Sequence, residues 1–205
     1  MATLRPFTPP LIVVIDGPNR VGKSTLIANL QRTFGFDYVM KGNAPSSPEA
    51  AEINTWNMLV WMAATQKHFL FDRFYYPTDL IYRRALERKP SYFLEKYEPG
   101  IQRLLHLMRV FYVFLDAPDS VLIERNAASD PHWHIGRGDM IPQIAELYRN
   151  LSANFALPHC IVSTDQPPAQ TQIEVERHLH LHYAQVLDTA HDTDRLVPGK
   201  VSQLK

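Results

Sequence analysis

The feature that most constrains this chain is a glycine-rich segment at Gly17–Ser24, Gly-Pro-Asn-Arg-Val-Gly-Lys-Ser, which fits the pattern G-x-x-x-x-G-K-[ST]. It follows a continuous β-branched run at Leu11–Ile15 and precedes apolar residues at helical spacing over Lys23–Phe34. A buried strand, a glycine turn and a helix predict a loop whose backbone N–H groups surround a phosphate at a helix N-terminus. The sequence therefore predicts binding of a nucleoside triphosphate with Mg²⁺.

Individual positions of this loop have expected roles. Lys23 is expected to reach the β- and γ-phosphates, and Ser24 is expected to hold Mg²⁺ through its hydroxyl. The glycines allow the backbone to wrap closely around the phosphates. The loop residues expected to contact ATP are Gly17, Asn19, Arg20, Val21, Gly22, Lys23, Ser24 and Thr25.

Strand-like and helical segments alternate along most of the chain. The strand-like runs lie at about 11–15, 37–40, 68–72, 110–115 and 159–163. This alternation predicts an α/β fold with a mainly parallel sheet that is covered on both faces. We expect one domain over residues 1–187, with its last helix at about 169–187, followed by a flexible polar tail at 188–205.

Composition narrows the class of protein. The 21 Lys and Arg residues balance 21 Asp and Glu residues, which argues against a protein that coats nucleic acid through its overall charge. Cys160 is the single cysteine, so a secreted disulfide scaffold is excluded, and its place in a strand predicts a core residue. No apolar run reaches about 18 residues. We therefore expect a cytoplasmic protein that does not contact a membrane.

The rest of the chain selects among nucleotide-binding classes. The guanine motif Asn-Lys-x-Asp is absent, which argues against a GTP switch, and phosphoryl transfer to a small acceptor remains. Asp72 and Arg73 follow a predicted strand at the sheet edge that faces the ligand crevice. Asp72 is expected to orient or deprotonate an acceptor hydroxyl, or to hold Mg²⁺ through water, and Arg73 is expected to clamp an acceptor phosphate. A surface ion pair is the alternative interpretation.

Three segments together resemble thymidylate kinase and its neighbours among the deoxynucleoside kinases. They are Asp16–Thr25, then Asp72-Arg73-Phe-Tyr, and then Phe-Leu-Asp116-Ala-Pro-Asp119 before a helix. Over about residues 11–185 the resemblance implies a three-layer P-loop kinase fold with a five-stranded parallel sheet and a helical lid at about 125–138. It also implies a homodimer, and transfer of the ATP γ-phosphoryl to a deoxynucleoside monophosphate, with dTMP or a related pyrimidine nucleotide as the leading acceptor.

The resemblance also implies roles for single residues. Arg20 would be the catalytic arginine of the subgroup that keeps it in the loop. Arg125, as a further ATP contact, and Arg137, as a catalytic group, would neutralise phosphate charge at the lid. The residues that we expect to bind the acceptor are Asp16, Asn19, Trp56, Arg73, Phe74 and Tyr76. For the aromatic members of this set, stacking on a base and packing in the core are both open.

The chain departs from the family pattern at positions that choose the acceptor. Asn19 stands where thymidylate kinases commonly carry an acid, and Ala51 and Thr55 stand where a phenylalanine and an arginine normally contact thymine. The segment 41–45 lacks the acidic base of nucleoside kinases. The alternatives are a deoxynucleoside kinase that phosphorylates a free 5′-hydroxyl, a P-loop kinase acting on a modified base or an end in DNA, and a nucleotide-binding module without activity.

Overall fold

The computed structural model describes residues 10–42, 47–65, 67–87, 92–128 and 140–195. Their backbone forms one five-stranded sheet in the order β2-β3-β1-β4-β5, in which every neighbouring pair is parallel. The strands are β1 (Ile12–Asp16), β2 (Tyr38–Lys41), β3 (Phe69–Asp72), β4 (Phe111–Asp116) and β5 (His159–Ser163). The predicted parallel α/β sheet is therefore confirmed.

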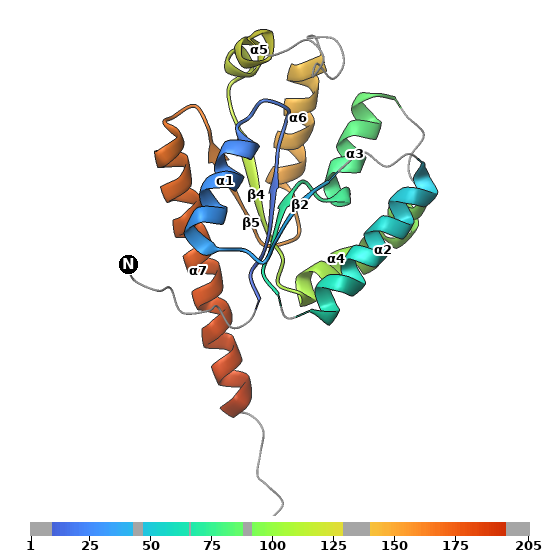
Figure 1. Ribbon diagram of the computed structural model, residues 1–205. Coiled ribbons are helices and arrows are strands. Elements are labelled where there is room, and N and C mark those ends of the chain that lie inside the picture. Colours follow the sequence, from blue (N-terminus) through green and yellow to red (C-terminus); the bar gives the residue numbers. More distant parts are fainter. Residues whose placement is uncertain (1–9, 43–46, 66, 88–91, 129–139, 196–205) are drawn as a thin grey trace, which may run out of the picture.

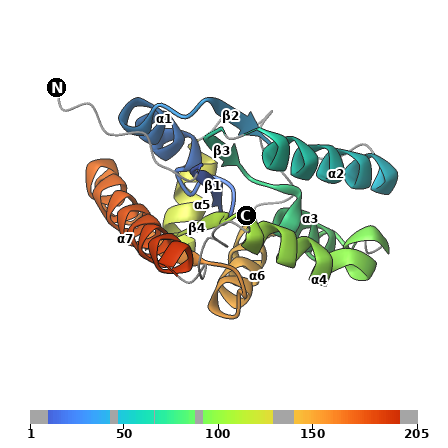
Figure 2. The ribbon, with the colours of Figure 1, turned by 90° about the horizontal axis from the view of Figure 1, so that it is seen from below.

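Helices cover both faces of the sheet, which makes three layers (Figures 1 and 2). One face carries α1 (Lys23–Phe34) and α7 (Pro168–Arg195), and the other carries α2 (Pro48–Ala64), α3 (Tyr75–Ala85), α4 (Tyr92–Leu107) and α6 (Met140–Ala153). The short helix α5 (Asp119–Ala127) lies beyond the carboxyl ends of the strands. β1 is buried over its whole length because both faces of the central strand are covered.

Local signals explain where these helices begin and end. Gly22, with φ 101°, precedes α1, and Gly35, with φ 64°, follows it and donates its N–H to the Gln31 carbonyl. Ser47 caps α2 by accepting the Ala50 N–H at 3.2 Å.

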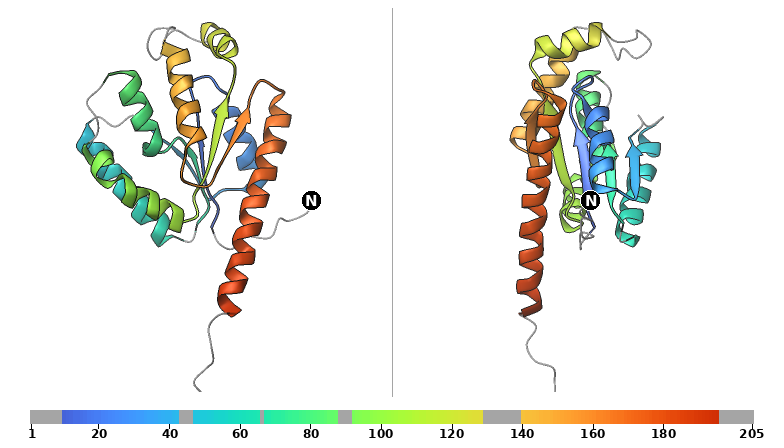
Figure 3. Two further views of the ribbon diagram at one scale, coloured as in Figure 1. Left: turned by 180° about the vertical axis from the view of Figure 1, so that it is seen from behind. Right: turned by 60° about the vertical axis from the view of Figure 1, so that its left-hand side comes forward.

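One predicted boundary is wrong. Helix α7 continues to Arg195 instead of ending at Leu187, so the expected tail at 188–205 begins within a helix (Figure 3). The physical reason is that the chain carries no glycine or proline between Leu187 and Pro198 that would stop the helix. Within the described residues, none of the helices combines the length and apolarity that crossing a bilayer requires.

The single cysteine supplies a test of the core. Cys160 is a buried residue of β5, and burial raises the pKa of its thiol to about 12. At pH 8 the thiolate fraction is then roughly 10⁻⁴, and the thiolate is the reactive form. We expect a colorimetric thiol reagent to leave the native protein unlabelled over minutes and to label one thiol in guanidinium chloride at a denaturing concentration. Rapid labelling of the native protein would contradict this packing.

Candidate active site

The Gly17–Ser24 loop connects β1 to α1 at the carboxyl edge of the sheet (Figure 1). Gly17 has φ 139°, and a Cβ atom there would lie 2.5 Å from the Leu115 carbonyl oxygen. Only glycine combines this backbone conformation with so close an approach to β4. Arg20 also has a left-handed backbone, with φ 66°. The loop therefore has the tightly folded shape that the sequence predicted.

Lys23 is held over this loop. Its side chain is buried, with 7% of its surface exposed, and Nζ donates to the carbonyl oxygens of Gly17 at 3.0 Å and Pro18 at 2.7 Å. Burial, followed by the charge of Arg73, holds the pKa of Lys23 well below its usual range. The ammonium is therefore positioned at the loop, and an anionic phosphate would favour its charged form.

The two residues that the sequence predicts as Mg²⁺ ligands, Ser24 and Asp72, lie next to the phosphate loop. Ser24 is exposed in the first turn of α1, and Asp72 is partly exposed at the end of β3. Asp72 is close enough to Lys23 to raise its pKa electrostatically. One hydroxyl and one carboxylate fit Mg²⁺, which usually takes one or two protein ligands together with substrate phosphates and water.

Arg73 is the centre of a buried polar network on the other side of the loop. Its Nη2 donates to Asn19 Oδ1 at 2.6 Å, to Tyr82 Oη at 2.8 Å and to the Gly17 carbonyl oxygen at 3.2 Å. The guanidinium lies 5.1 Å from the centroid of the Tyr82 ring. Only 17% of the Arg73 side chain is exposed. The structure thus brings together two predicted residues, Asn19 and Arg73, in direct contact.

Asp16 joins this network from the end of β1. Its side chain is fully buried, and its oxygens accept hydrogen bonds from the Gly17 N–H at 2.8 Å, the Tyr148 hydroxyl at 2.8 Å and the Thr78 hydroxyl at 2.7 Å. Arg73 Nε lies 3.8 Å from Asp16 Oδ1. Burial raises the pKa of Asp16, while the Arg73 charge and these hydrogen bonds act in the opposite direction.

Three residues of this network were missed by sequence reasoning. They are Thr78 and Tyr82 on α3 and Tyr148 on α6. Thr78 and Tyr82 are four positions apart in the segment that follows Asp72-Arg73, which places both on one face of a helix. This spacing was the sequence signal that could have identified them. Tyr148 carries no such local signal.

Two acceptor predictions need correction. Phe74 and Tyr76 are 3% and 2% exposed and belong to the core cluster on the α2, α3, α4 and α6 face of the sheet. The Tyr76 hydroxyl donates to Glu98 Oε1 at 3.1 Å and accepts from Gln102 at 2.6 Å. Both rings pack in the core, because the chain turns into α3 immediately after Arg73. Neither ring is therefore placed to stack on an acceptor base.

Two further predicted residues are Trp56 and Arg137. Trp56 is half-buried on α2 and packs edge-on against Tyr97 of α4, with ring centroids 6.3 Å apart. Arg137, and the predicted lid from residue 129 onward, lie outside the described residues.

A pocket of about 380 Å³ opens beside the phosphate loop on the side opposite β3. Arg125 of α5 forms part of its wall by donating to Thr164 Oγ1 at 3.1 Å and to the Thr164 carbonyl oxygen at 2.8 Å. The volume of this pocket is in the range of small-molecule sites. The lining residues are Arg20, Val21, Gly22, Thr25, Leu26, Arg125, Thr164, Gln166, Pro168 and Thr171.

No family model matches the chain, and no curated protein matches its sequence. Solved structures do match. YorR from Bacillus subtilis, in complex with phosphorylated GDP, has a TM-score of 0.67 and 20% identity, and the match covers 84% of this chain and 98% of that one. Deoxyadenosine kinase from M. mycoides, with products dCMP and dCDP bound, has a TM-score of 0.55 and 13% identity over 83% and 98% of the two chains.

A gluconokinase from Sinorhizobium meliloti 1021 also matches, with a TM-score of 0.51 and 16% identity over 90% of this chain and 98% of that one. At these identities the likeness establishes the fold alone. The chain has the fold of P-loop kinases. The three-layer architecture with a five-stranded parallel sheet is therefore confirmed.

Proposed function

We propose that this chain is a nucleoside monophosphate kinase that transfers the γ-phosphoryl of ATP to a deoxynucleoside monophosphate. The observation that carries the proposal is the buried Arg73 guanidinium directly beside the phosphate loop. Its nearest hydrogen-bond partners, Asn19, Tyr82 and the Gly17 carbonyl, are neutral. The nearest carboxylate is that of the buried Asp16, whose Oδ1 lies 3.8 Å from Arg73 Nε. A guanidinium whose hydrogen bonds go to neutral groups suits a dianionic phosphate as a new partner, because charge-assisted bidentate bonds are the strong ones.

In this proposal the donor and the acceptor bind on opposite sides of the phosphate loop. The pocket beside Arg125 and Thr164 would take the adenosine of ATP, and Arg73 would take the acceptor phosphate on the far side of the loop. Lys23 would stabilise charge on the transferring group between them, with Arg20 and Arg137 as further cations. Catalysis of this kind consists of positioning and charge neutralisation, not of covalent chemistry by the protein.

Mg²⁺ would be held by Ser24 and Asp72, and when bound it would neutralise charge on the β- and γ-phosphates. Asp72 would also orient the attacking acceptor oxygen. Asn19 would add a neutral hydrogen-bonding group on the acceptor side, next to Arg73. The base of the acceptor, for which dTMP or a related pyrimidine nucleotide is our first candidate, would be selected by other residues, with Trp56 as one candidate.

A deoxynucleoside kinase is the second candidate. The partly exposed carboxylate of Asp72 at the end of β3 favours it, because a base near this edge would accept the proton of a free 5′-hydroxyl. The fold shared with a deoxyadenosine kinase agrees with either candidate.

The test is ADP release from ATP and Mg²⁺ over a panel of acceptors. The panel holds dTMP, dUMP, dCMP, the purine deoxynucleoside monophosphates, ribonucleoside monophosphates, the free nucleosides and oligodeoxynucleotides. We expect one or two deoxynucleoside monophosphates to stimulate ADP release well above the level of their nucleosides. Stimulation by nucleosides alone would favour the second candidate, and stimulation by oligodeoxynucleotides alone would contradict both. ATP binding without any stimulation would indicate a nucleotide-binding module.

A further inference from the structure

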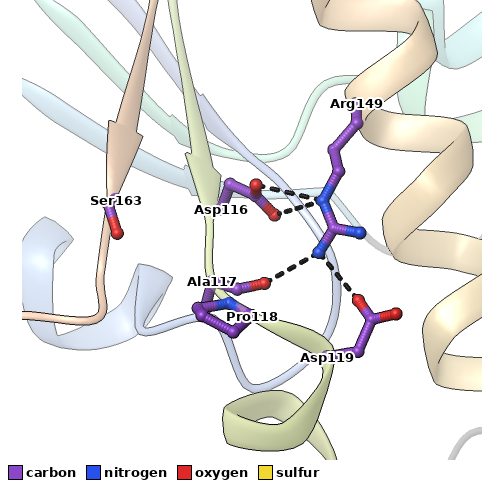
Figure 4. A pocket seen from close by; sticks show the side chains of 6 residues that line it. All are labelled: Asp116, Ala117, Pro118, Asp119, Arg149 and Ser163. Atoms are coloured by element: carbon purple, nitrogen blue, oxygen red, sulfur yellow. Dashed lines mark hydrogen bonds and ion pairs between the residues drawn. The ribbon is translucent and has the colours of Figure 1, made fainter.

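Arg149 of α6 forms a clamp at the junction of β4 and α5 (Figure 4). Its Nε donates to both carboxylate oxygens of Asp116 at 3.1 Å, and its Nη2 donates to the Ala117 carbonyl oxygen and to Asp119 Oδ1, each at 2.8 Å. One guanidinium therefore fixes the end of β4, the connecting turn and the first residue of α5. Such a planar fork has a single well-defined geometry.

The clamp is connected to the pocket beside the phosphate loop through Asp116. The Asp116 carbonyl oxygen accepts two hydrogen bonds from Thr164, one from its N–H at 2.8 Å and one from its hydroxyl at 3.2 Å. Thr164 in turn accepts both hydrogen bonds of Arg125. Arg149 thus fixes the side chain of Asp116, and the main chain of Asp116 fixes Thr164 in the pocket wall.

The clamp also bears on Arg125 by a second route. Asp119 is the first residue of α5, and Arg125 lies in the last turn of the same helix. A bond that fixes the start of this short helix fixes the direction in which its last turn points. Both routes end at Arg125, on one wall of the pocket.

The neighbouring residue on α6 makes a contrasting contact. Tyr148 donates its hydroxyl to Asp16, which belongs to the Arg73 network on the acceptor side of the loop. Two consecutive side chains of one helix therefore reach the two sides of the site. This arrangement separates their expected effects, because each side chain touches only one of the two hydrogen-bond networks described above.

We propose that Arg149 is a positioning residue for the nucleoside pocket of the phosphate donor, acting through Asp116 on Thr164 and Arg125. The proposal rests on the proposed function for the identity of the donor, ATP. A residue that merely stabilised the fold would weaken donor and acceptor binding together. A positioning residue of the donor pocket weakens donor binding selectively.

The first experiment is calorimetric titration of the full chain with ATP and Mg²⁺, together with steady-state KM values. We expect Arg149→Met to raise the Kd for ATP roughly tenfold, as expected for the loss of hydrogen bonds to charged groups, and to leave the acceptor KM within about twofold. Tyr148→Phe is expected to show the reverse pattern. Arg149→Lys, which keeps the charge and loses the fork, is expected to lie between Arg149→Met and the wild type.

Controls and a coupled variant complete the test. Arg103→Met removes an exposed arginine of α4 and is expected to leave both constants unchanged. Asp116→Asn is expected to raise the Kd for ATP, and the double variant with Arg149→Met is expected to be little worse than either single variant, because both break the same link. If Arg149→Met does not fold, Arg149→Lys and Asp116→Asn carry the test.

An unchanged Kd for ATP in the folded variants, or equal losses for donor and acceptor, would overturn the proposal. The titration needs no acceptor, so its outcome is distinct from that of the acceptor panel. A wild-type chain that binds ATP but turns over no acceptor would refute only the kinase function. A wild-type chain that does not bind ATP would refute both.

Discussion

Replacement of Lys23 with methionine is expected to slow acceptor-dependent ADP release by roughly 10²–10³-fold, the usual cost of losing one preorganised group that stabilises transition-state charge. The ammonium is buried at the loop and held by the Gly17 and Pro18 carbonyl oxygens. Methionine fills a similar volume without charge or donors. Turnover is therefore expected to fall while the variant stays folded.

The thermal stability of the Lys23→Met variant should not fall with its turnover. Because burial holds the pKa of Lys23 below its ordinary value of 10.5, the unfolded chain binds this proton more readily than the folded chain. The buried lysine therefore costs stability at neutral pH, and this cost disappears as the pH rises through 10.5. We expect the Lys23→Met variant to unfold at the same or a higher temperature than the wild type at pH 7, with the difference shrinking at higher pH.

The matched control for this prediction is Lys67→Met. Lys67 is an exposed lysine that pairs with Asp37 at 3.2 Å, away from the loop, so its loss is expected to leave turnover unchanged. Near-normal turnover of Lys23→Met, measured on protein with a wild-type far-ultraviolet circular dichroism spectrum, would contradict the assigned role. Equal losses in both variants would indicate a general effect of charge.

The sheet and the phosphate loop were predictable because their signals are local. The runs at 11–15 and 110–115 are continuous and apolar, as strands covered on both faces must be, and they became β1 and β4 with small shifts. The Gly17–Ser24 pattern lies within a single strand–loop–helix unit, so its neighbours in sequence are also its neighbours in space. The five strand-like runs predicted the strand number, and the resemblance to known kinases implied the same number.

The acceptor side was less predictable because its contacts join distant parts of the chain. Thr78 reaches Asp16 across 62 positions, and Tyr148 reaches the same carboxylate across 132. Burial at a strand end is equally hard to infer, since Phe74 and Tyr76 follow Asp72-Arg73 directly and yet face the core. Only the packing of α3 and α6 against the sheet decides which of these side chains meet the site.

Replacement of Arg73 with methionine is expected to reduce kcat/KM for the acceptor monophosphate by roughly 10²–10³-fold, because truncation of a buried, hydrogen-bonded charge typically costs several kcal/mol. Most of the loss should appear in the acceptor KM. The Kd for ATP, measured without acceptor, is expected to remain within about threefold of wild type. Arg73 bonds to Asn19 and Tyr82, and none of these three residues lines the pocket that Arg125 and Thr164 share. Steady-state kinetics with varied acceptor and calorimetry with ATP separate these two effects.

Two further variants decide what the guanidinium contributes. Arg73→Lys keeps a cation near Asp16 but lacks the planar guanidinium that contacts Asn19, Tyr82 and the Gly17 carbonyl oxygen, so we expect it to recover only a small part of the lost kcat/KM. Arg84→Met removes an exposed arginine of the helix that follows, α3, and is expected to change neither constant. The kcat/KM for a nucleoside acceptor, which carries no phosphate for Arg73 to bind, should fall far less than the kcat/KM for the monophosphate. If Arg73→Met instead weakens ATP binding and leaves the acceptor KM unchanged, Arg73 serves the donor, and the division of the site on the two sides of the loop is wrong.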